Sequence, residues 1–525
     1  MPTLEWIGKD KVVNHHLEVP YRVLEEQYTY NADKSNNMII RGDNLEALKA
    51  LLPRYEGKIR CIYIDPPYNT GEENWVYNDS VNDPKIKKWL GDVVGKEGED
   101  LTLHDKWLCM IYPRLKLLQR LLKSDGVIFI SIDDNELANL RLVCDEIFGN
   151  QNFIATFIWE KRLNRENRKI VSSRHDYVLC YAKAIVDEKR VLKQLPMSGE
   201  ALDRYSNPDN DPRGPWKSDP ATAQAGHATK AQFYVLVTPS GKKHKLPAGR
   251  CWLYTESVMM KAIEEGRIWL GPDGNNTPRK KTYLYEKDRG LTPETIWFGN
   301  EVSTNEMAKN ELKTIFPETI PFTTPKPPSL IERIMTLCMD DTDIILDSFA
   351  GSGTTAHAVL NMNKADGGSR KFILVEMMDY AESITAERVK RVIDGFGSGK
   401  QAVEGTGGDF TFYDLGPVLL LPDGNLNEEV GVAKIREYVY FMETKTALHK
   451  ENPDEPYFMG VHVDSAYYFY YEKERLTTLN REFLHGIKTK ASQYTIYADQ
   501  CTLSPAELER WHITFKKIPR DISRL

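Results

Sequence analysis

Lys58-Ile-Arg-Cys-Ile-Tyr-Ile64, followed at once by Asp65-Pro-Pro-Tyr68, is the stretch that decides the fold class. Its apolar and β-branched residues predict a buried strand that ends at the aspartate. Short apolar runs alternate with amphipathic helices on both sides of it along the chain, which indicates a parallel α/β sheet. The other expected elements are strands at 38–41, 127–132, 344–346 and 372–375, and helices at about 44–52, 104–122, 329–339 and 356–362.

The regular alternation stops between about 185 and 310, where turn dipeptides such as Asn207-Pro208 multiply. One hairpin is expected there, with arms at 233–237 and 242–245. Clustered glycines from 395 to 408 predict a linker, and 28–37 is expected to be a loop. The predicted parts are a lead-in (1–37), a first α/β half (38–184), an irregular inserted domain (185–310), a second α/β half (311–396) and an α+β C-terminal domain (397–525).

The composition, with 41% hydrophobic and 28% charged residues, is that of an ordinary globular protein. No apolar run approaches the roughly 20 residues that span a bilayer, and no signal-peptide pattern follows Met1, so we expect a cytoplasmic protein without membrane contact. The 7 cysteines form no C-x-x-C pair and there is no H-E-x-x-H motif, so we expect no metal site. Asp133-Asp134-Asn-Glu136 is instead predicted to be a capped helix start, with Glu136 in the first turn.

The net charge of −7 hides a local basic surplus, because residues 151–320 contain 27 Lys and Arg against 21 Asp and Glu. A local basic patch is the feature expected for contact with nucleic-acid phosphates. The alternative is a charge run that is merely solvated. Six basic residues between two predicted strands are the candidates for phosphate contact: Lys161, Arg162, Arg165, Arg168, Lys169 and Arg174.

Asp65-Pro66-Pro67-Tyr68 lies at the carboxyl end of its strand, where open α/β sheets place their active sites. The prolines fix the backbone φ angle and remove two N–H donors, so the local carbonyls become rigid acceptors. The Asp65 carboxylate and the Pro66 carbonyl can take both N–H protons of an exocyclic amine such as adenine N6, and Tyr68 can stack on the base. The alternative is an ordinary turn capped by two prolines.

A second motif, Ile345-Leu-Asp347-Ser-Phe-Ala-Gly351-Ser-Gly353-Thr-Thr355, links a predicted strand to a predicted helix. Such a glycine-rich turn lets the backbone approach a nucleotide, and the helix N-terminus offers free N–H groups. It is not a P-loop, because no Lys follows the glycines. The next predicted strand ends at Glu376, which suits the two hydroxyls of a ribose, with a solvated strand end as the alternative.

Together the two motifs resemble the permuted, β-class amino-methyltransferases, in which the catalytic motif precedes the cofactor motif. The form that the chain resembles is the modification subunit of type III restriction-modification systems. The resemblance covers about 38–395 and includes Asp65-Pro-Pro-Tyr-Asn-Thr-Gly71, Phe349-Ala-Gly-Ser-Gly353, Thr324-Pro-Lys326-Pro327 and Gly42-Asp43-Asn44. It implies a Rossmann-like fold that binds S-adenosylmethionine, with the inserted domain recognising the target sequence.

The resemblance also implies roles for single residues. Asp43 would approach the cofactor adenine, although a helix N-cap explains it equally well, and Lys326 would lie near the methionine end. Tyr177 would stack with Tyr68 on a flipped base, with a buried strand tyrosine as the alternative. The other implied cofactor residues are Asp347, Phe349, Ala350, Gly351, Gly353, Thr354 and Glu376. Base-reading candidates in the inserted domain are Arg213, Lys217, Lys242, Lys243, Lys245, Arg279, Lys280 and Lys281.

The resulting functional hypothesis is transfer of a methyl group from S-adenosylmethionine to adenine N6 in double-stranded DNA. Methylation of cytosine N4 is the nearest alternative, although the family's motifs for cytosine more usually begin with Ser than with Asp. A catalytically idle DNA-binding subunit is a second alternative. The resemblance further implies a homodimer and a separate helicase-nuclease restriction subunit, with the segment after about 400 as the candidate contact region.

Overall fold

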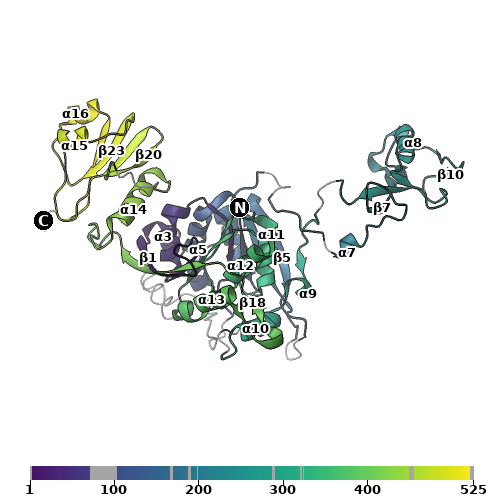
Figure 1. Cartoon of the computed structure of the whole chain (residues 1–525), viewed down its shortest axis with the longest axis horizontal. Coiled ribbons are helices and arrows are strands. Elements are labelled where there is room, and N and C mark those ends of the chain that lie inside the picture. Colours follow the sequence, from purple (N-terminus) through teal and green to yellow (C-terminus); the bar gives the residue numbers. More distant parts are fainter. Residues whose placement is uncertain are drawn as a thin grey trace. The chain divides into compact units, whose positions relative to one another are not determined.

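The computed structural model describes residues 3–70, 103–165, 170–186, 191–197, 199–286, 290–319, 322, 324–448 and 454–520. The chain forms two compact units, drawn in Figure 1. The first combines Met1–Leu192 with Glu294–Leu525, and the second is the insertion Lys193–Pro293.

The first unit is built on a ten-stranded sheet, in the order β1-β19-β2-β16-β15-β3-β4-β6-β5-β14 among the described residues. Neighbours from β19 to β4 are parallel, whereas β1, β6 and β5 each run antiparallel to a neighbour. The predicted α/β class is therefore confirmed, as a mixed sheet. The strands are β1 (Arg22–Tyr30), β2 (Met38–Arg41), β3 (Ile59–Ile64), β4 (Leu122–Ile132), β5 (Phe153–Glu160), β6 (His175–Ala182), β14 (Ile296–Trp297), β15 (Ile344–Asp347), β16 (Lys371–Glu376) and β19 (Phe410–Val418).

Helices pack on both faces of this sheet because successive side chains of a strand point to opposite faces. All of β3 is buried, and its Ile62 and Ile64 pack in one core with Leu48 and Trp107 from helices on one side. Cys61 contacts Cys338 of a helix on the other side. The helices of the sheet region are α1 (Lys9–Val12), α2 (His15–Glu18), α3 (Asn44–Tyr55), α5 (Leu103–Leu121), α6 (Leu137–Phe148), α9 (Gly299–Val302), α10 (Asn305–Ile315), α11 (Pro328–Cys338), α12 (Thr354–Asp366) and α13 (Glu387–Asp394).

The two outermost strands on one side differ from the sequence-based division of the chain. β1 includes 28–30, which were expected to form a loop, and β19 lies beyond the predicted boundary at 397. Only Val23 and Leu24 of β1 are buried, whereas Glu25, Glu26 and Gln27 are exposed and 28–30 are half-buried, as expected of a strand at the sheet edge. Neither the lead-in nor the start of the C-terminal part is thus separate from the sheet.

The inserted unit, Lys193–Pro293, is narrower than the predicted 185–310. β14 accounts for part of the difference, since it pairs with β5 in the large sheet. A backbone bridge between Leu195 and Leu291, with two N–H···O bonds of 2.8 Å, brings the ends of the insertion together. Its elements are β7 (Trp216–Pro220), β8 (Thr222–Gln224), β9 (Leu236–Val237), β10 (Lys243–His244), β11 (Arg250–Trp252), β12 (Ile268–Trp269), β13 (Arg279–Tyr283), α7 (Gly199–Leu202) and α8 (Glu256–Glu264), and β9 with β10 confirms the expected hairpin.

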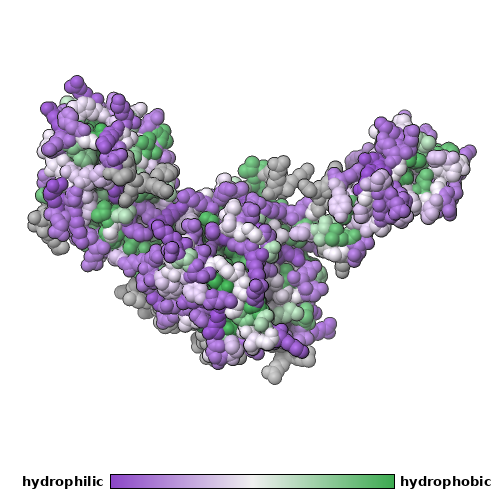
Figure 2. Space-filling view, viewed as in Figure 1, coloured by the Kyte–Doolittle hydropathy of each residue, from purple (hydrophilic) through white to green (hydrophobic). Residues whose placement is uncertain are grey.

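The C-terminal part contains a four-stranded sheet in the order β20-β21-β23-β25. A hydrophobic cluster joins it to the large sheet, because Val23 of β1 packs with Leu419, Ile435 and Met459. Among the described helices, none combines the length and the apolar character needed to cross a membrane, and Figure 2 shows mostly hydrophilic residues on the visible face. The elements are α14 (Val432–Thr444), β20 (Phe458–His462), β21 (Ser465–Phe469), β22 (Thr478–Leu479), α15 (Arg481–His485), β23 (Gln493–Ala498), β24 (Gln500–Cys501), α16 (Pro505–Arg510) and β25 (Ile513–Lys517).

Candidate active site

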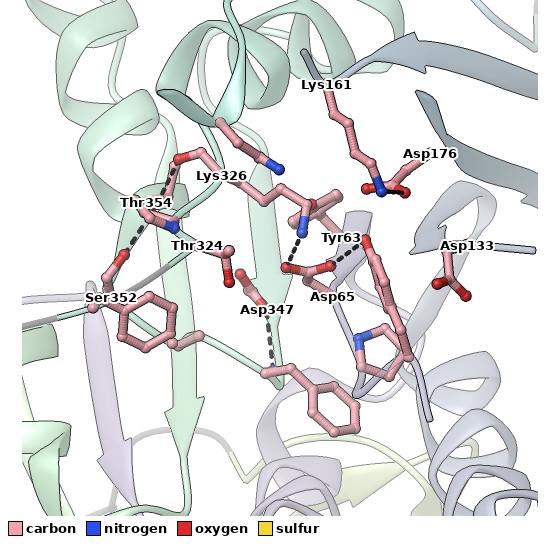
Figure 3. A pocket seen from close by; sticks show the side chains of 18 of the residues that line it. Tyr63, Asp65, Asp133, Lys161, Asp176, Thr324, Lys326, Asp347, Ser352 and Thr354 are labelled. Carbon is pink, nitrogen blue, oxygen red and sulfur yellow. Dashed lines mark hydrogen bonds and ion pairs between the residues drawn. The ribbon is translucent and has the colours of Figure 1, made fainter. Parts of the chain in front are cut away.

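A cavity of about 440 Å³ lies at one edge of the large sheet, where five neighbouring strands begin or end. β15, β3, β4 and β5 end at this edge, and the antiparallel β6 begins there. The cavity therefore collects side chains from both halves of the sheet region (Figure 3). Its described lining includes Tyr63, Asp65, Pro66, Tyr68, Asp133, Asn135, Lys161, Arg162, Asp176, Asn305, Thr324, Lys326, Asp347, Phe349, Ala350, Gly351, Ser352, Thr354 and Thr355.

Asp65 stands at the centre of this wall, directly after β3. One carboxylate oxygen accepts a hydrogen bond of 2.9 Å from the Tyr68 hydroxyl, and the other accepts one of 2.5 Å from Lys326 Nζ. A carboxylate offers about four lone-pair positions, so two of them stay available to a ligand. The structure thus joins two residues that the sequence assigned to separate motifs, Asp65 and Lys326.

The two prolines of the motif have different environments. The Pro67 carbonyl accepts a hydrogen bond of 2.7 Å from the indole N–H of the fully buried Trp107, whereas Pro66 lines the cavity. Tyr68 also lines it, and the Lys326 ammonium lies 5.0 Å from the centre of its ring. The Lys326 ammonium therefore covers one face of the Tyr68 ring.

The loop from Asp347 to Gly353 follows β15 and is held by its own side chains. The Asp347 carboxylate accepts from Phe349 N at 3.0 Å and from Thr355 Oγ1 at 2.6 Å, and burial raises its pKa to about 7. Gly351 and Gly353 have φ angles of 52° and 80°, which L side chains rarely adopt. Thr355 and its neighbours then begin α12, whose free N–H groups point back at the loop.

Glu376, at the end of β16, lies beneath this loop and is 3% exposed. Its carboxylate accepts from Gly351 N at 2.8 Å and from Met378 N at 3.0 Å. Burial raises the pKa of Glu376 to about 7. The side chain thus fixes the loop conformation and is not among the residues that line the cavity, so its contact with a ribose stays a prediction.

Asp43 is the N-cap of α3, the alternative that the sequence had left open. Its carboxylate accepts from Leu45 N at 2.8 Å and from Glu46 N at 3.3 Å, and it is not part of the cavity wall. The following residue, Asn44, donates to the Ser348 carbonyl at 3.2 Å. The segment therefore supports the glycine loop through Asn44.

The wall opposite the loop contains two acidic residues, Asp176, to which the sequence had assigned no role, and Asp133, which it had assigned only to a helix start. Asp176 is 2% exposed and accepts a hydrogen bond of 2.5 Å from Lys161 Nζ. Asp133 also lines the cavity, and burial raises its pKa to about 6. The sequence did contain a sign of this site, because Asp176 is a single acidic residue in an otherwise apolar strand pattern. Burial of a carboxylate without a partner is costly.

The structure does not bring Tyr177 into the cavity. Asp176 points into the cavity, so its neighbour on β6 points to the other face of the sheet. There the Tyr177 hydroxyl donates to Asp134 at 2.8 Å, and the ring packs edge-on to His175. Tyr177 is only half-buried, so it is not the buried strand tyrosine of the alternative, and its stacking on a base stays a prediction.

The predicted basic run divides into different environments. Lys161 and Arg162 line the cavity, while Arg174 pairs with Glu160 and Arg165 is exposed. Arg168 and Lys169 lie outside the described residues.

Glu136 does not cap α6, although it occupies the N-cap position. Its fully buried carboxylate accepts from Asn69 Nδ2 at 2.5 Å and Asn139 Nδ2 at 2.8 Å, and it bonds His104 Nδ1 at 2.7 Å. The predicted helix start is present, because α6 begins at Leu137, but Glu136 lies just before the first turn and its side chain makes no cap. Glu136 anchors the segment that follows Tyr68, because Asn69 belongs to that segment.

Two of the base-reading candidates in the inserted unit are engaged internally. Lys281 is 5% exposed and pairs with Asp211 at 2.8 Å and also with Asp209. Arg213 pairs with Asp211 at 2.7 Å and stacks on Tyr283. Both side chains hold the fold of the unit together.

A mixed sheet with a glycine-rich loop at one end of a cavity and Asp-Pro-Pro-Tyr at its centre is the architecture of an α/β nucleotide-dependent enzyme. The sequence profile of the family described as DNA methylase matches residues 59–387, and the chain belongs to this family.

Two relatives of similar sequence agree with this assignment. The StyLTI Mod subunit, a type III restriction-modification enzyme of Salmonella typhimurium LT2, is 35% identical over 391 residues, which is 71% of this chain and 57% of the relative. The type II methyltransferase M.KpnI of Klebsiella pneumoniae is 32% identical over 381 residues, covering 67% of this chain and 85% of the relative. Among solved structures, the cytosine-N4-specific PvuII DNA methyltransferase superposes with a TM-score of 0.34 at 15% identity, over 68% of this chain and 87% of its own. The chain thus spans less than two thirds of the StyLTI Mod subunit.

Proposed function

We propose that this protein is an S-adenosylmethionine-dependent DNA methyltransferase that methylates adenine N6. One observation carries the proposal: a single cavity is lined by Asp65, Pro66 and Tyr68 on one side and by the loop from Asp347 to Thr355 on another. Membership of the DNA methylase family supplies the class of substrate. Adenine is preferred to cytosine because the catalytic motif begins with Asp65.

The lining of the cavity fits S-adenosylmethionine, which carries a sulfonium and an ammonium cation. Asp65 and Asp347 are both part of the wall near the loop, and carboxylates are the side chains that suit such cations. Phe349 and the N–H groups at the start of α12 suit the nucleoside part. A volume of about 440 Å³ lies within the usual range of small-molecule sites. When bound, the cofactor supplies an electrophilic methyl group.

The protein's own part in the reaction is to hold the target amine. The lone pair of adenine N6 is delocalised into the ring, so the nitrogen is a poor nucleophile. The Asp65 carboxylate and the Pro66 carbonyl accept the two N–H groups and favour a tetrahedral nitrogen. Lys326 and Tyr68 hold the carboxylate in place at 2.5 and 2.9 Å. Because in-line positioning is the main requirement, this arrangement needs no separate general base.

The experiment that tests this function compares the wild-type protein with Asp65→Ala in the transfer of label from S-adenosylmethionine to duplex DNA. We expect a loss of at least about a hundredfold in rate, since a group that holds the reacting atoms is removed. Binding of S-adenosylmethionine, measured by calorimetry, is the control for a folded site. Equal incorporation by both proteins would overturn the mechanism.

Within the same proposal, the chain is the modification subunit of a type III system. The identity of 35% to the StyLTI Mod subunit supports this assignment. Its partners are then double-stranded DNA, a second copy of the chain and a helicase-nuclease restriction subunit. Arg162, Arg165 and Arg174 contact phosphates, together with Arg168 and Lys169. The inserted unit 193–293 reads the recognition sequence. The remaining base-reading candidates are the exposed Lys242, Lys243 and Lys245 and the half-buried Lys217, Arg279 and Lys280.

A further inference from the structure

The order of the strands divides the cavity into two halves. β3, which delivers Asp65, lies between β15 on one side and β4, β6 and β5 on the other. The glycine-rich loop follows β15, so the cofactor half of the cavity is on that side. Figure 3 shows the same division, with Asp347, Ser352 and Thr354 to one side of Asp65 and Lys161, Asp176 and Asp133 to the other. Since a transferred methyl passes between cofactor and amine at Asp65, the base occupies the half formed by β4, β6 and β5.

The outstanding feature of this second half is the ion pair between Lys161 and Asp176. The two side chains are 2.5 Å apart, and the side chains are 18% and 3% exposed. Asp176 belongs to β6, and Lys161 directly follows β5, the antiparallel neighbour of β6. Asp65 has its own lysine, Lys326, at the same distance of 2.5 Å. Asp65 and Asp176 thus each pair with a separate lysine.

Stabilisation of the fold is a weak explanation for this ion pair. Removing two charges from water costs about as much free energy as their attraction returns, so a buried pair is weak evidence for a structural role. The ammonium of Lys161 has three N–H groups. One of them bonds Asp176, and Lys161 is itself part of the cavity wall. It therefore has donors to offer to a molecule in the cavity.

We propose that Lys161 is a base-binding residue, which donates a hydrogen bond to the ring nitrogen next to the target amine, and that Asp176 is its positioning residue. This assignment rests on the proposed function. Adenine has such acceptors on either side of its amine, N1 and N7. A phosphate is a less suitable ligand, because Lys161 is only 18% exposed and shares the cavity wall with the carboxylates of Asp65 and Asp176, which repel an anion. A neutral base, in contrast, can displace water from a neutral pair without leaving a buried charge unpaired.

The test uses duplexes that contain the mapped target site with adenine, 1-deazaadenine or 7-deazaadenine at the methylated position. In each analogue one ring nitrogen is replaced by C–H, so one acceptor is lost. We expect the wild-type protein to lose about tenfold or more in kcat/KM on one of the two analogues, the usual effect of losing a hydrogen bond to a charged group. Lys161→Met should have a lower kcat/KM on adenine than the wild-type protein. Its kcat/KM on the analogue that the wild-type protein disfavours should equal its kcat/KM on adenine. Asp176→Asn should weaken the discrimination, and Lys161→Arg should retain part of it.

Arg174→Met is the matched control, because Arg174 is a cation on the same strand connection that pairs with Glu160. As a phosphate contact it should raise KM for all three duplexes by the same factor. Thermal unfolding of each variant shows whether it folds. The inference is overturned if the wild-type protein uses both analogues as well as adenine, or if folded Lys161→Met keeps the discrimination. If the wild-type protein transfers no methyl group to adenine, the proposed function itself fails, which is a separate result.

Discussion

Asp347 is buried in the wall of the cavity, and its carboxylate makes the stability of the folded protein depend on pH. Burial raises its pKa to about 7, although two hydrogen bonds favour the charged form. In an unfolded chain an aspartate has a pKa of about 3.9. The folded protein therefore holds the proton more tightly, and the resulting stabilisation is complete below about pH 4 and is lost as the pH rises through about 7.

The raised pKa of Asp347 predicts how the stability of the wild-type protein changes with pH relative to Asp347→Asn, whose side chain cannot ionise. The free energy of unfolding of the wild-type protein, relative to the variant, should fall by about 1.4 kcal/mol for each pH unit between about 4 and 7. Glu376, whose pKa is also raised to about 7, is present in both proteins and largely cancels. Denaturant titrations at several pH values measure the difference. A difference that rises with pH would contradict the assigned direction.

Much of the residue-level site could be predicted from the sequence, because Asp65-Pro-Pro-Tyr68 and the loop after Asp347 are continuous motifs. Asp176 and Trp107 could not be assigned, since their roles depend on which strand ends and helices meet. Tyr177 does not line the cavity, because its neighbour Asp176 does and successive side chains of a strand point to opposite faces. Residues within a continuous motif could therefore be predicted from the sequence, whereas residues that meet only across the folded sheet could not.

At the scale of elements, α3 shows how a helix end supports the glycine loop. Asp43 caps the helix with hydrogen bonds of 2.8 and 3.3 Å, and Asn44 holds the Ser348 carbonyl. Asn44 in turn accepts from the buried Arg114, which also lies 3.4 Å from Asp43. The cap therefore contributes to the position of the loop through its neighbour.

Asp43→Ala should destabilise the protein by about 1 kcal/mol, the usual cost of losing an N-cap. Because the Asp43 carboxylate is not part of the cavity wall, the Kd for S-adenosylmethionine should not rise as much as tenfold. Ser504→Ala, which removes the cap of α16, is a control for the loss of a cap elsewhere. A loss of cofactor affinity of tenfold or more in Asp43→Ala, but not in Ser504→Ala, would contradict this prediction and support the direct contact that family resemblance implies.

The elements themselves were predictable where burial is periodic. β2, β3, β15, β16, α3 and α5 each lie within a few residues of the expected ranges. β1 and β19 were not predicted, because one has mostly exposed or half-buried residues at a sheet edge and the other follows a glycine-rich stretch that resembles a linker. Strand pairing between residues nearly 400 apart in the chain, such as Arg22 and Val418, leaves no local signal.

At the scale of the whole molecule, the chain is a sheet-based unit interrupted by one insertion. The bridge between Leu195 and Leu291 places the two ends of the insertion side by side, which lets a unit be inserted without disturbing the sheet. The acidic net charge of −7 belongs to the chain as a whole, while 151–320 has a basic surplus. This division matches the proposed roles, since only the DNA-facing region needs positive charge.

The most direct test of the account is the identity of the methylated base. Duplex DNA is incubated with the wild-type protein and S-adenosylmethionine, digested to nucleosides and analysed by mass spectrometry, with Asp65→Ala in parallel. The account predicts N6-methyladenine with the wild-type protein and none above background with the variant. N4-methylcytosine as the product, or equal methylation by both proteins, would contradict it.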